Sequence, residues 1–428
     1  MPMKKTPEEL RREFWENDLM QGGMIYSQYT QVKNILSTQD EQWVHQQYRL
    51  LRKHAIEQTE FYKDRNLDEV FPVVNKSTIL ENYEAHKARA GYDYPLHTSY
   101  TSGSTGTPFA VIQDYKKRSR TIADLKVFGE LCDYPSHECM VLLRVLSNHL
   151  RRTPEQEDRE NIYYVDSSKL DLQGLGEMVE EIYKRKPRIL FSYASTLSAL
   201  AKYVKAEGIA ADSFSMRSVL TAGEGISDGN RLLVEETFGC TVYRRYADIE
   251  LGILAQDAGN GSAYVLNHGS YFFECLKLDS DEPAPYGEVG RIVITDLFNY
   301  AFPMIRYDTG DLGIMDLLPG ETFPVLREIY GRKRDCIYTT AGDLLSPAKI
   351  SVLMWGAKGV DQWQFIQENA KEYTLKLNCS KEITDVPEIL NRLYGILGSD
   401  AVIAVEYVDG IVVLRSNKFR AVICNYTK

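Results

Sequence analysis

The chain has 428 residues, of which 44% are hydrophobic, and this is enough material for two or three domains with sizeable cores. Sixty acidic residues outweigh fifty basic ones, so the net charge is −10, and no strongly basic patch stands out along the sequence. This balance argues against a protein that binds nucleic acid or an anionic membrane surface.

The first residues are charged and lead directly into a helix. Thr6 and Glu9 have the spacing of a capping box, with Pro7 at the first helical position. Such a start is not that of a signal peptide, and no apolar run approaches the roughly 20 residues that cross a bilayer. The seven cysteines lack the paired spacings of a zinc site or of a secreted disulfide framework. We therefore expect a cytoplasmic protein with reduced thiols.

Helical periodicity dominates residues 1–90, and the pattern changes after residue 100. Short β-branched or aromatic runs then alternate with amphipathic helices. The strand-like runs are residues 141–146, 162–165, 188–193, 218–221 and 241–246. Two further runs, 271–278 and 290–296, follow with little helix between them. This order predicts an α/β fold with a layered core whose second half is more antiparallel.

The C-terminal part has a pattern of its own. Its pattern predicts a strand at 372–379, a helix over 387–397, and a hairpin of 402–407 with 411–415 around an Asp-Gly turn. We predict three parts in all. They are a helical lead-in at 1–90, the core of an N-terminal domain at 91–333, and a small α+β domain at 334–428, with a charged linker at 332–335.

A glycine- and hydroxyl-rich run lies between the helical lead-in and the apolar residues 109–112. Residues 98–108 read TSYTSGSTGTP. Glycines let backbone N–H groups turn toward an anion, and Ser and Thr hydroxyls add neutral donors, so the composition suits a phosphate-binding loop. The run is not a Walker A loop, because no Gly-Lys-Ser/Thr follows. The same composition is also typical of a flexible linker, so the assignment of a phosphate site depends on the other motifs of the chain.

Further motifs follow the loop in a characteristic order. They are TAGE at 221–224, YADIELG at 246–252, PMIRYDTGD at 303–311, GRKRD at 331–335 with TAGDLLSP at 340–347, and SNKFR at 416–420. Together with the loop, they resemble the adenylate-forming superfamily across roughly residues 98–420, most closely the phenylacetate–CoA ligases and their capsule-locus relatives. Each motif taken singly has an ordinary structural explanation, and their joint occurrence in order carries the resemblance.

The resemblance implies a fold and a reaction. The fold is α/β, with a large N-terminal domain of layered mixed sheets and helices and a small, mobile C-terminal α+β domain that turns about the linker. The reaction is ATP-dependent activation of a carboxylic acid to an acyl-AMP, followed by transfer to a thiol, most readily that of coenzyme A. The resemblance further implies an aromatic or arylacetic acid as the substrate and Mg²⁺ as a cofactor. It also implies a place in capsule biosynthesis and assembly as a homodimer.

The resemblance also assigns site residues. It places the nucleotide and cofactors on Thr101, Ser102, Gly103, Ser104, Thr105, Gly106, Ala222, Gly223, Glu224, Tyr246, Asp311, Arg332 and Gly342. The expected catalytic residues are Lys418, Glu250 and Thr105. Lys418 would bridge the substrate carboxylate and the α-phosphate, Glu250 would hold Mg²⁺, and Thr105 would donate to the phosphates.

Other roles follow from the same resemblance. Tyr246 would stack on adenine and Asp311 would accept hydrogen bonds from both ribose hydroxyls. Arg332 would contact ribose or phosphate, and Gly342 would leave room for the coenzyme A arm. Tyr193 and Gly223 would line the pocket of the acid.

The sequence departs from the family pattern in three places. Ile249 stands where the family usually has Thr, Arg334 replaces a hinge carboxylate, and Asn417 replaces Gly, which Asn can mimic at positive φ. Some relatives also carry a cysteine-rich zinc site in the segment that corresponds to 257–274. Here that segment offers His268 and no cysteine, so we expect no zinc and a hydrogen-bonded turn histidine.

Two other functions remain open at this point. Amide-forming ligases share similar motifs, so the acceptor of the acyl group could be an amine. The departures at Ile249 and Arg334 would also suit a nucleotide-binding scaffold that has lost catalysis. Retention of the other predicted residues argues against the scaffold, and the Gly342 loop favours a thioester.

Overall fold

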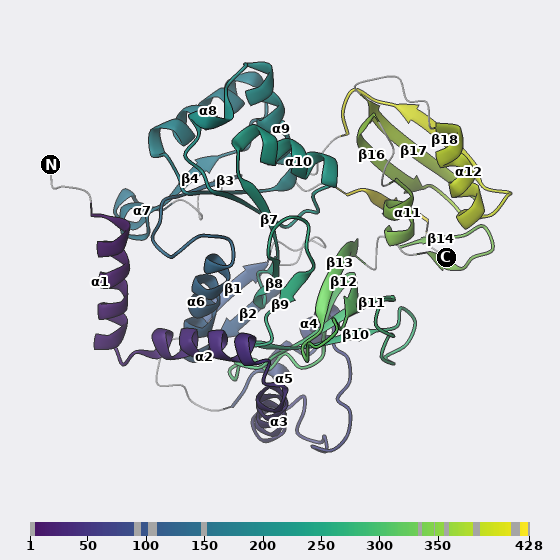
Figure 1. The fold of residues 1–428 in the computed structure, drawn as a ribbon. Coiled ribbons are helices and arrows are strands. Elements are labelled where there is room, and N and C mark those ends of the chain that lie inside the picture. The colour runs from purple at the N-terminus through teal and green to yellow at the C-terminus, as the bar shows by residue number, and fades with distance from the viewer. Residues whose placement is uncertain are drawn as a thin grey trace. The chain divides into compact units, whose positions relative to one another are not determined.

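The computed structural model describes most of the chain (Figure 1). The described residues are 5–89, 96–101, 109–146, 152–332, 336–345, 347–354, 359–379, 386–411 and 420–426. They form two compact units. The first consists of Met1–Glu274, Val293–Thr309 and Asp316–Arg327, and the second of Cys275–Ile292, Gly310–Met315 and Glu328–Lys428.

Helices make up the N-terminal part of the first unit. They are α1 (Pro7–Met20), α2 (Met24–Thr38), α3 (Glu41–Gln58), α4 (Lys76–Glu81) and α5 (Tyr83–His86). The predicted capping box is confirmed, because the Glu9 amide donates to the Thr6 hydroxyl and the Glu9 carboxylate accepts from the Thr6 amide. Among the described residues, no helix combines the length and apolarity that crossing a membrane requires.

A parallel sheet follows in the first unit. Its neighbouring strands are β4 (Ile162–Asp166), β3 (Met140–Arg144), β5 (Ile189–Ser192), β6 (Ser218–Ala222) and β7 (Thr241–Asp248). Helix α6 (Tyr115–Glu130) precedes the first of these strands in the chain. The helices between the strands are α7 (Pro154–Glu160), α8 (Leu172–Arg185), α9 (Ala194–Ala206), the short 3-10 helix η1 (Ala211–Ser213) and α10 (Asp228–Phe238). Figure 1 shows α8, α9 and α10 over one face of these strands, where their apolar side chains and those of the sheet form one core. Each strand run predicted here is confirmed within two residues.

The sheet continues beyond β7 with antiparallel pairs, which agrees with the prediction of a more antiparallel second half of the core. β8 (Gly252–Asp257) pairs with β7 and with β9 (Tyr264–Leu266). The remaining strands follow in the order β13 (Val325–Arg332), β12 (Tyr307–Asp316), β11 (Val289–Asp296) and β10 (Tyr271–Leu276). The mixed α/β fold is therefore confirmed. Helix α6 packs against β8 and α2.

The second unit contains a small α+β structure with its own core. A four-stranded sheet has the order β18 (Val402–Tyr407), β17 (Glu372–Cys379), β16 (Val360–Gln367) and β19 (Val422–Cys424). Helices α11 (Pro347–Met354) and α12 (Val386–Leu397) bury their apolar sides against it, together with the short strands β14 (Ile337–Tyr338) and β15 (Leu344–Leu345). The first strand of the predicted hairpin is confirmed as β18, which pairs in parallel with β17. Residues 412–415 of its second strand lie outside the described residues.

Candidate active site

The end of β6 brings two predicted segments together. After this buried strand, Gly223 has a φ of +79°, a conformation that favours glycine. The next residue, Glu224, accepts a hydrogen bond at 2.9 Å from the amide of Ser195, 29 residues away, in the first turn of α9. A carboxylate at this end of a helix is electrostatically favourable. Tyr193 is the N-cap of α9, so the chain around Tyr193 is held next to Glu224.

Glu250 lies on the tight turn that joins β7 to β8. Asp248 and Gly252 are register partners, so three residues make the turn. The Asp248 carboxylate accepts a hydrogen bond at 2.6 Å from the amide of Leu251 and closes it. Ile249, at the position of the family's Thr, is 54% exposed. Within the described parts of the chain, Glu250 forms no hydrogen bond or ion pair, so its carboxylate oxygens are available to a ligand.

Tyr246 connects two of the predicted motifs. Its ring is 8% exposed at the end of β7, and its hydroxyl lies 3.3 Å from the hydroxyl of Thr309. Thr309 belongs to the motif at 303–311. The first unit thus holds the YADIELG motif against the first part of the RYDTGD motif, which the chain order alone did not require. Stacking of Tyr246 on adenine stays a prediction.

Arg306 was not assigned a role from the sequence, and it is held by several contacts in the first unit. It is 5% exposed and has a φ of +52°, which is unusual for a bulky residue. Its guanidinium binds the Glu274 carboxylate at 3.0 Å and donates to the Phe71 carbonyl at 2.7 Å, while its amide donates to the Thr295 hydroxyl. Arg306 therefore fixes the start of β12, the strand that carries Thr309. The signal in the sequence that could have indicated its buried position is that Arg306 is the one charged residue within the run PMIRY.

Three predicted residues lie in the second unit. Asp311 lies within β12, partly exposed, directly after Gly310, whose φ is +77°. Gly342 lies in the turn between β14 and β15 with a φ of +88°, and its amide donates to the Thr339 carbonyl. Arg332 is the last residue of β13. The turn conformation explains why glycine stands at 342, and the ligand roles of all three stay predictions.

Several predicted residues lie outside the described ones. They are Ser102, Gly103, Ser104, Thr105 and Gly106 of the phosphate loop, Arg334 and Asp335 of the linker, and Asn417 and Lys418 near the C-terminus. The strands that flank the loop are described. β1 (His97–Thr101) and β2 (Phe109–Gln113) pair antiparallel, with Thr101 opposite Phe109.

His268 is a hydrogen-bonded turn residue, as the sequence predicted. Its ring lies 3.3 Å from the Pro324 carbonyl and stacks on Phe323 with ring centroids 4.2 Å apart. Burial lowers its pKa to about 4, so the neutral ring is the stable form at neutral pH.

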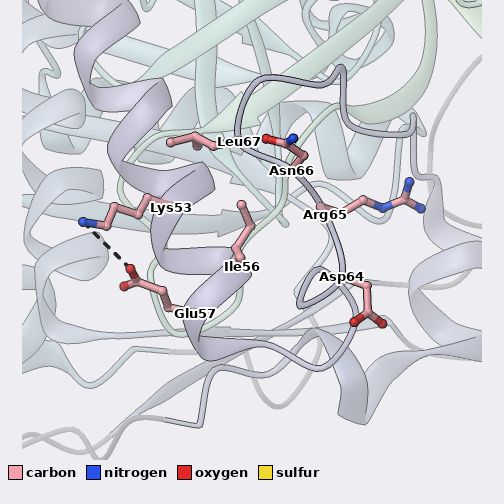
Figure 2. Close-up of a pocket in the computed structure, with 7 residues that line it drawn as sticks. All are labelled: Lys53, Ile56, Glu57, Asp64, Arg65, Asn66 and Leu67. Carbon is pink, nitrogen blue, oxygen red and sulfur yellow. Dashed lines mark ion pairs between the residues drawn. The ribbon is translucent and has the colours of Figure 1, made fainter.

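A surface pocket in the first unit is lined by none of the predicted residues. Figure 2 shows its lining residues on α3 and on the loop that follows. Its volume is about 460 Å³. It is lined by Lys53, Ile56, Glu57, Asp64, Arg65, Asn66 and Leu67. Two cationic and two anionic side chains line it, and Lys53 and Glu57 pair with each other at 3.9 Å, so the charges of this pocket are balanced.

Parts of the chain are similar in sequence to known proteins. Residues 337–425 match the family model described as the CapK C-terminal domain. Phenylacetate-coenzyme A ligase of Thermus thermophilus is 23% identical over 317 residues, 69% of this chain and 67% of that protein. The Pseudomonas putida enzyme of the same name is 26% identical over 166 residues, so the match spans only 37% of its length and 38% of this chain.

Solved structures show the same fold. 2-Hydroxyisobutyryl-CoA ligase, in the postadenylation state with R3-HIB-AMP, has a TM-score of 0.71 at 18% identity, with 90% of this chain and 89% of that chain covered. ATP-bound MatB from Rhodopseudomonas palustris has a TM-score of 0.54 at 18% identity, with 75% and 65% covered. The resemblance to the adenylate-forming superfamily is confirmed.

Proposed function

We propose that this protein is an AMP-forming acid–thiol ligase that activates a carboxylic acid with ATP and transfers the acyl group to coenzyme A. One observation carries the proposal. The chain has the fold of 2-hydroxyisobutyryl-CoA ligase over 90% of its length, and its nucleotide motifs follow in the family's order on that fold. The phenylacetate-coenzyme A ligase relatives support the same reaction class.

In the first half-reaction, a carboxylate oxygen of the acid attacks the α-phosphorus of ATP. A new O–P bond forms, the bond to the β-phosphate breaks, and pyrophosphate leaves. Thr101–Thr105 would donate to the phosphates and Lys418 would meet the charge that develops on the α-phosphate. In the second half-reaction, the thiol of coenzyme A attacks the acyl carbon, releases AMP and forms the thioester.

Glu250 is the residue that would hold Mg²⁺. Its carboxylate lies on an ordered turn, has no partner among the described residues, and supplies the hard oxygen that Mg²⁺ prefers, so the residue fits the ion. Mg²⁺ at this position would reduce the negative charge of the phosphates. Glu250 itself would orient the bound nucleotide by fixing the position of that charge.

Several finer points belong to the same proposal. An aromatic or arylacetic acid is the proposed substrate, because the curated relatives are phenylacetate-coenzyme A ligases. A small C-terminal domain beginning near residue 334 is supported by the family match at 337–425. Its proposed movement about the linker would let one site serve both half-reactions. ATP and coenzyme A are both cytoplasmic metabolites, so we propose that location. A homodimer is proposed from the resemblance alone.

The proposal is tested by pyrophosphate release from MgATP with a panel of aromatic, arylacetic and aliphatic acids. Each acid is run with coenzyme A, with a mixture of amines, and without an acceptor. We expect release with one acid class and acceleration by coenzyme A. Acceleration by amines alone would make the protein an amide-forming ligase. ATP binding without release across the whole panel would favour a scaffold.

A further inference from the structure

A chain of buried polar groups is hydrogen-bonded to the turn that carries Glu250. Lys117 of α6 and Asp296 at the end of β11 are both fully buried, and their ammonium and carboxylate groups are 2.6 Å apart. The Lys117 ammonium also donates to the hydroxyl of Tyr271 at 3.1 Å. That hydroxyl in turn donates to the carbonyl of Leu251 at 2.5 Å. All these groups belong to the first unit.

A gain in folding stability does not explain the buried Lys117–Asp296 ion pair. Desolvating two charges costs about as much as their attraction returns, so a buried ion pair is weak evidence for a stabilising role. What the pair does here is to hold the Tyr271 hydroxyl. The oxygen accepts from Lys117, and its proton is directed at Leu251. Groups from β11, α6 and β10 thus form a chain that ends, through the Tyr271 hydroxyl, at the Leu251 carbonyl of the β7–β8 turn.

The Leu251 residue is fixed from both sides. Its amide donates to Asp248 at 2.6 Å, and its carbonyl accepts from Tyr271. Gly252 then continues with a φ of +117°, and a Cβ there would lie 3.1 Å from the Tyr271 hydroxyl. Both the positive φ and the close approach of the hydroxyl favour glycine at 252. The turn cannot relax without breaking one of these contacts, and Glu250 is the residue next to the fixed one.

We propose that Tyr271, held by the Lys117–Asp296 ion pair, is a positioning residue that fixes the Glu250 carboxylate for MgATP. This inference rests on the proposed function, because it assigns Tyr271 to the step in which Glu250 would hold Mg²⁺. Tyr271 acts through the backbone of the turn and does not touch the nucleotide.

The test is the Mg²⁺ dependence of acid-dependent ATP–pyrophosphate exchange in Tyr271→Phe. Losing one hydrogen bond should raise the Mg²⁺ concentration for half-maximal exchange about three- to tenfold. Glu250→Gln should raise it as well. Because Tyr271 acts through Glu250, the double variant should need no more Mg²⁺ than Glu250→Gln alone. Additive effects in the double variant would overturn the inference.

Tyr163→Phe is the matched control. The Tyr163 ring is 2% exposed and its hydroxyl donates to Asp158 at 3.0 Å, so the change again removes one hydroxyl hydrogen bond from a buried tyrosine of the first unit. Its Mg²⁺ dependence should equal that of the wild type. Should Tyr271→Phe fail to fold, Asp248→Ala removes the other anchor of Leu251 and should raise the Mg²⁺ requirement in the same way. An unchanged requirement in the folded variant would overturn the inference.

Failure of the proposed function would be distinguishable. A wild-type protein without exchange for any acid would count against the ligase. Hydrogen exchange at the Leu251 amide would still test the positioning role, because it needs no activity. We expect faster exchange at this amide in Tyr271→Phe than in the wild type and Tyr163→Phe, and equal rates would count against the role of Tyr271.

Discussion

Lys418 is the residue on which the first half-reaction depends most in the proposed mechanism. A lysine ammonium is a compact charge on a flexible stem, which suits a group that must meet the α-phosphate and then leave. Lys418→Ala should lower acyl-AMP formation by about 10²–10³-fold, while ATP binding changes little. Single-turnover formation of acyl-AMP and equilibrium binding of ATP measure the two quantities separately.

Lys371→Ala controls for the loss of a lysine from the same unit. Its ammonium pairs with Asp400 at 2.6 Å, and both side chains are about half exposed. Exposed ion pairs of this kind contribute little to stability, so Lys371→Ala should form acyl-AMP and bind ATP as the wild type does. Undiminished acyl-AMP formation in Lys418→Ala would remove Lys418 from the mechanism.

At the scale of elements, Arg306 fastens the start of β12 to three other parts of the first unit. It binds Glu274 of β10, the Phe71 carbonyl of the lead-in and the Thr295 hydroxyl of β11. Arg306→Ala leaves the Glu274 carboxylate without the guanidinium and removes the side-chain contacts that hold residue 306 at positive φ. We expect a loss of about 3 kcal/mol or more in unfolding free energy, read as a lower midpoint of thermal unfolding.

Arg327→Ala is the comparison for that change. Arg327 also binds a carboxylate, that of Asp316 at 2.6 Å, but its side chain is 51% exposed. The expected loss there is below about 1 kcal/mol. Equal shifts of the unfolding midpoint in the two variants would contradict the role given to Arg306.

The elements were largely predictable because their signals are local. Strand β6 is a short β-branched run bounded by a glycine turn, and α1 begins with a capping box, so each could be found from neighbouring residues. The fold resemblance came from motif order, which is also a property of the sequence. Tyr246 is therefore found on the strand that the sequence predicted, near the end of β7.

The polar interior was not predictable in the same way. Lys117, Arg120 and Asp124 recur at helical spacing on α6, a pattern that indicates a solvated face, yet all three are buried. Their partners are remote, since Tyr271 is 154 residues from Lys117. A sequence pattern shows which positions are polar. It does not show which polar groups meet, and for this reason neither Tyr271 nor Arg306 was assigned a role.

At the scale of the whole molecule, buried histidines make stability depend on pH. Burial lowers the pKa of His137 to about 3 and that of His268 to about 4, from an ordinary value of 6.5. As the pH falls from 6.5 toward 4, the unfolded chain binds protons at these residues and the folded protein does not. The contribution of each histidine to the free energy of unfolding is therefore complete above pH 6.5. It decreases as the pH falls toward 4, by at most about 3 kcal/mol for each histidine.

Buried carboxyl groups act in the opposite direction in part of this range, since burial raises the pKa of Asp114 and Asp124. The histidine contribution is isolated by a double variant, His137→Asn with His268→Phe. Asn tolerates the φ of +69° at 137, and Phe keeps a ring against Phe323. Its thermal midpoint should fall less between pH 6.5 and 4 than that of the wild type. His45→Gln, at an exposed position, should follow the wild type. Parallel curves for the double variant and the wild type would show that other groups govern acid stability.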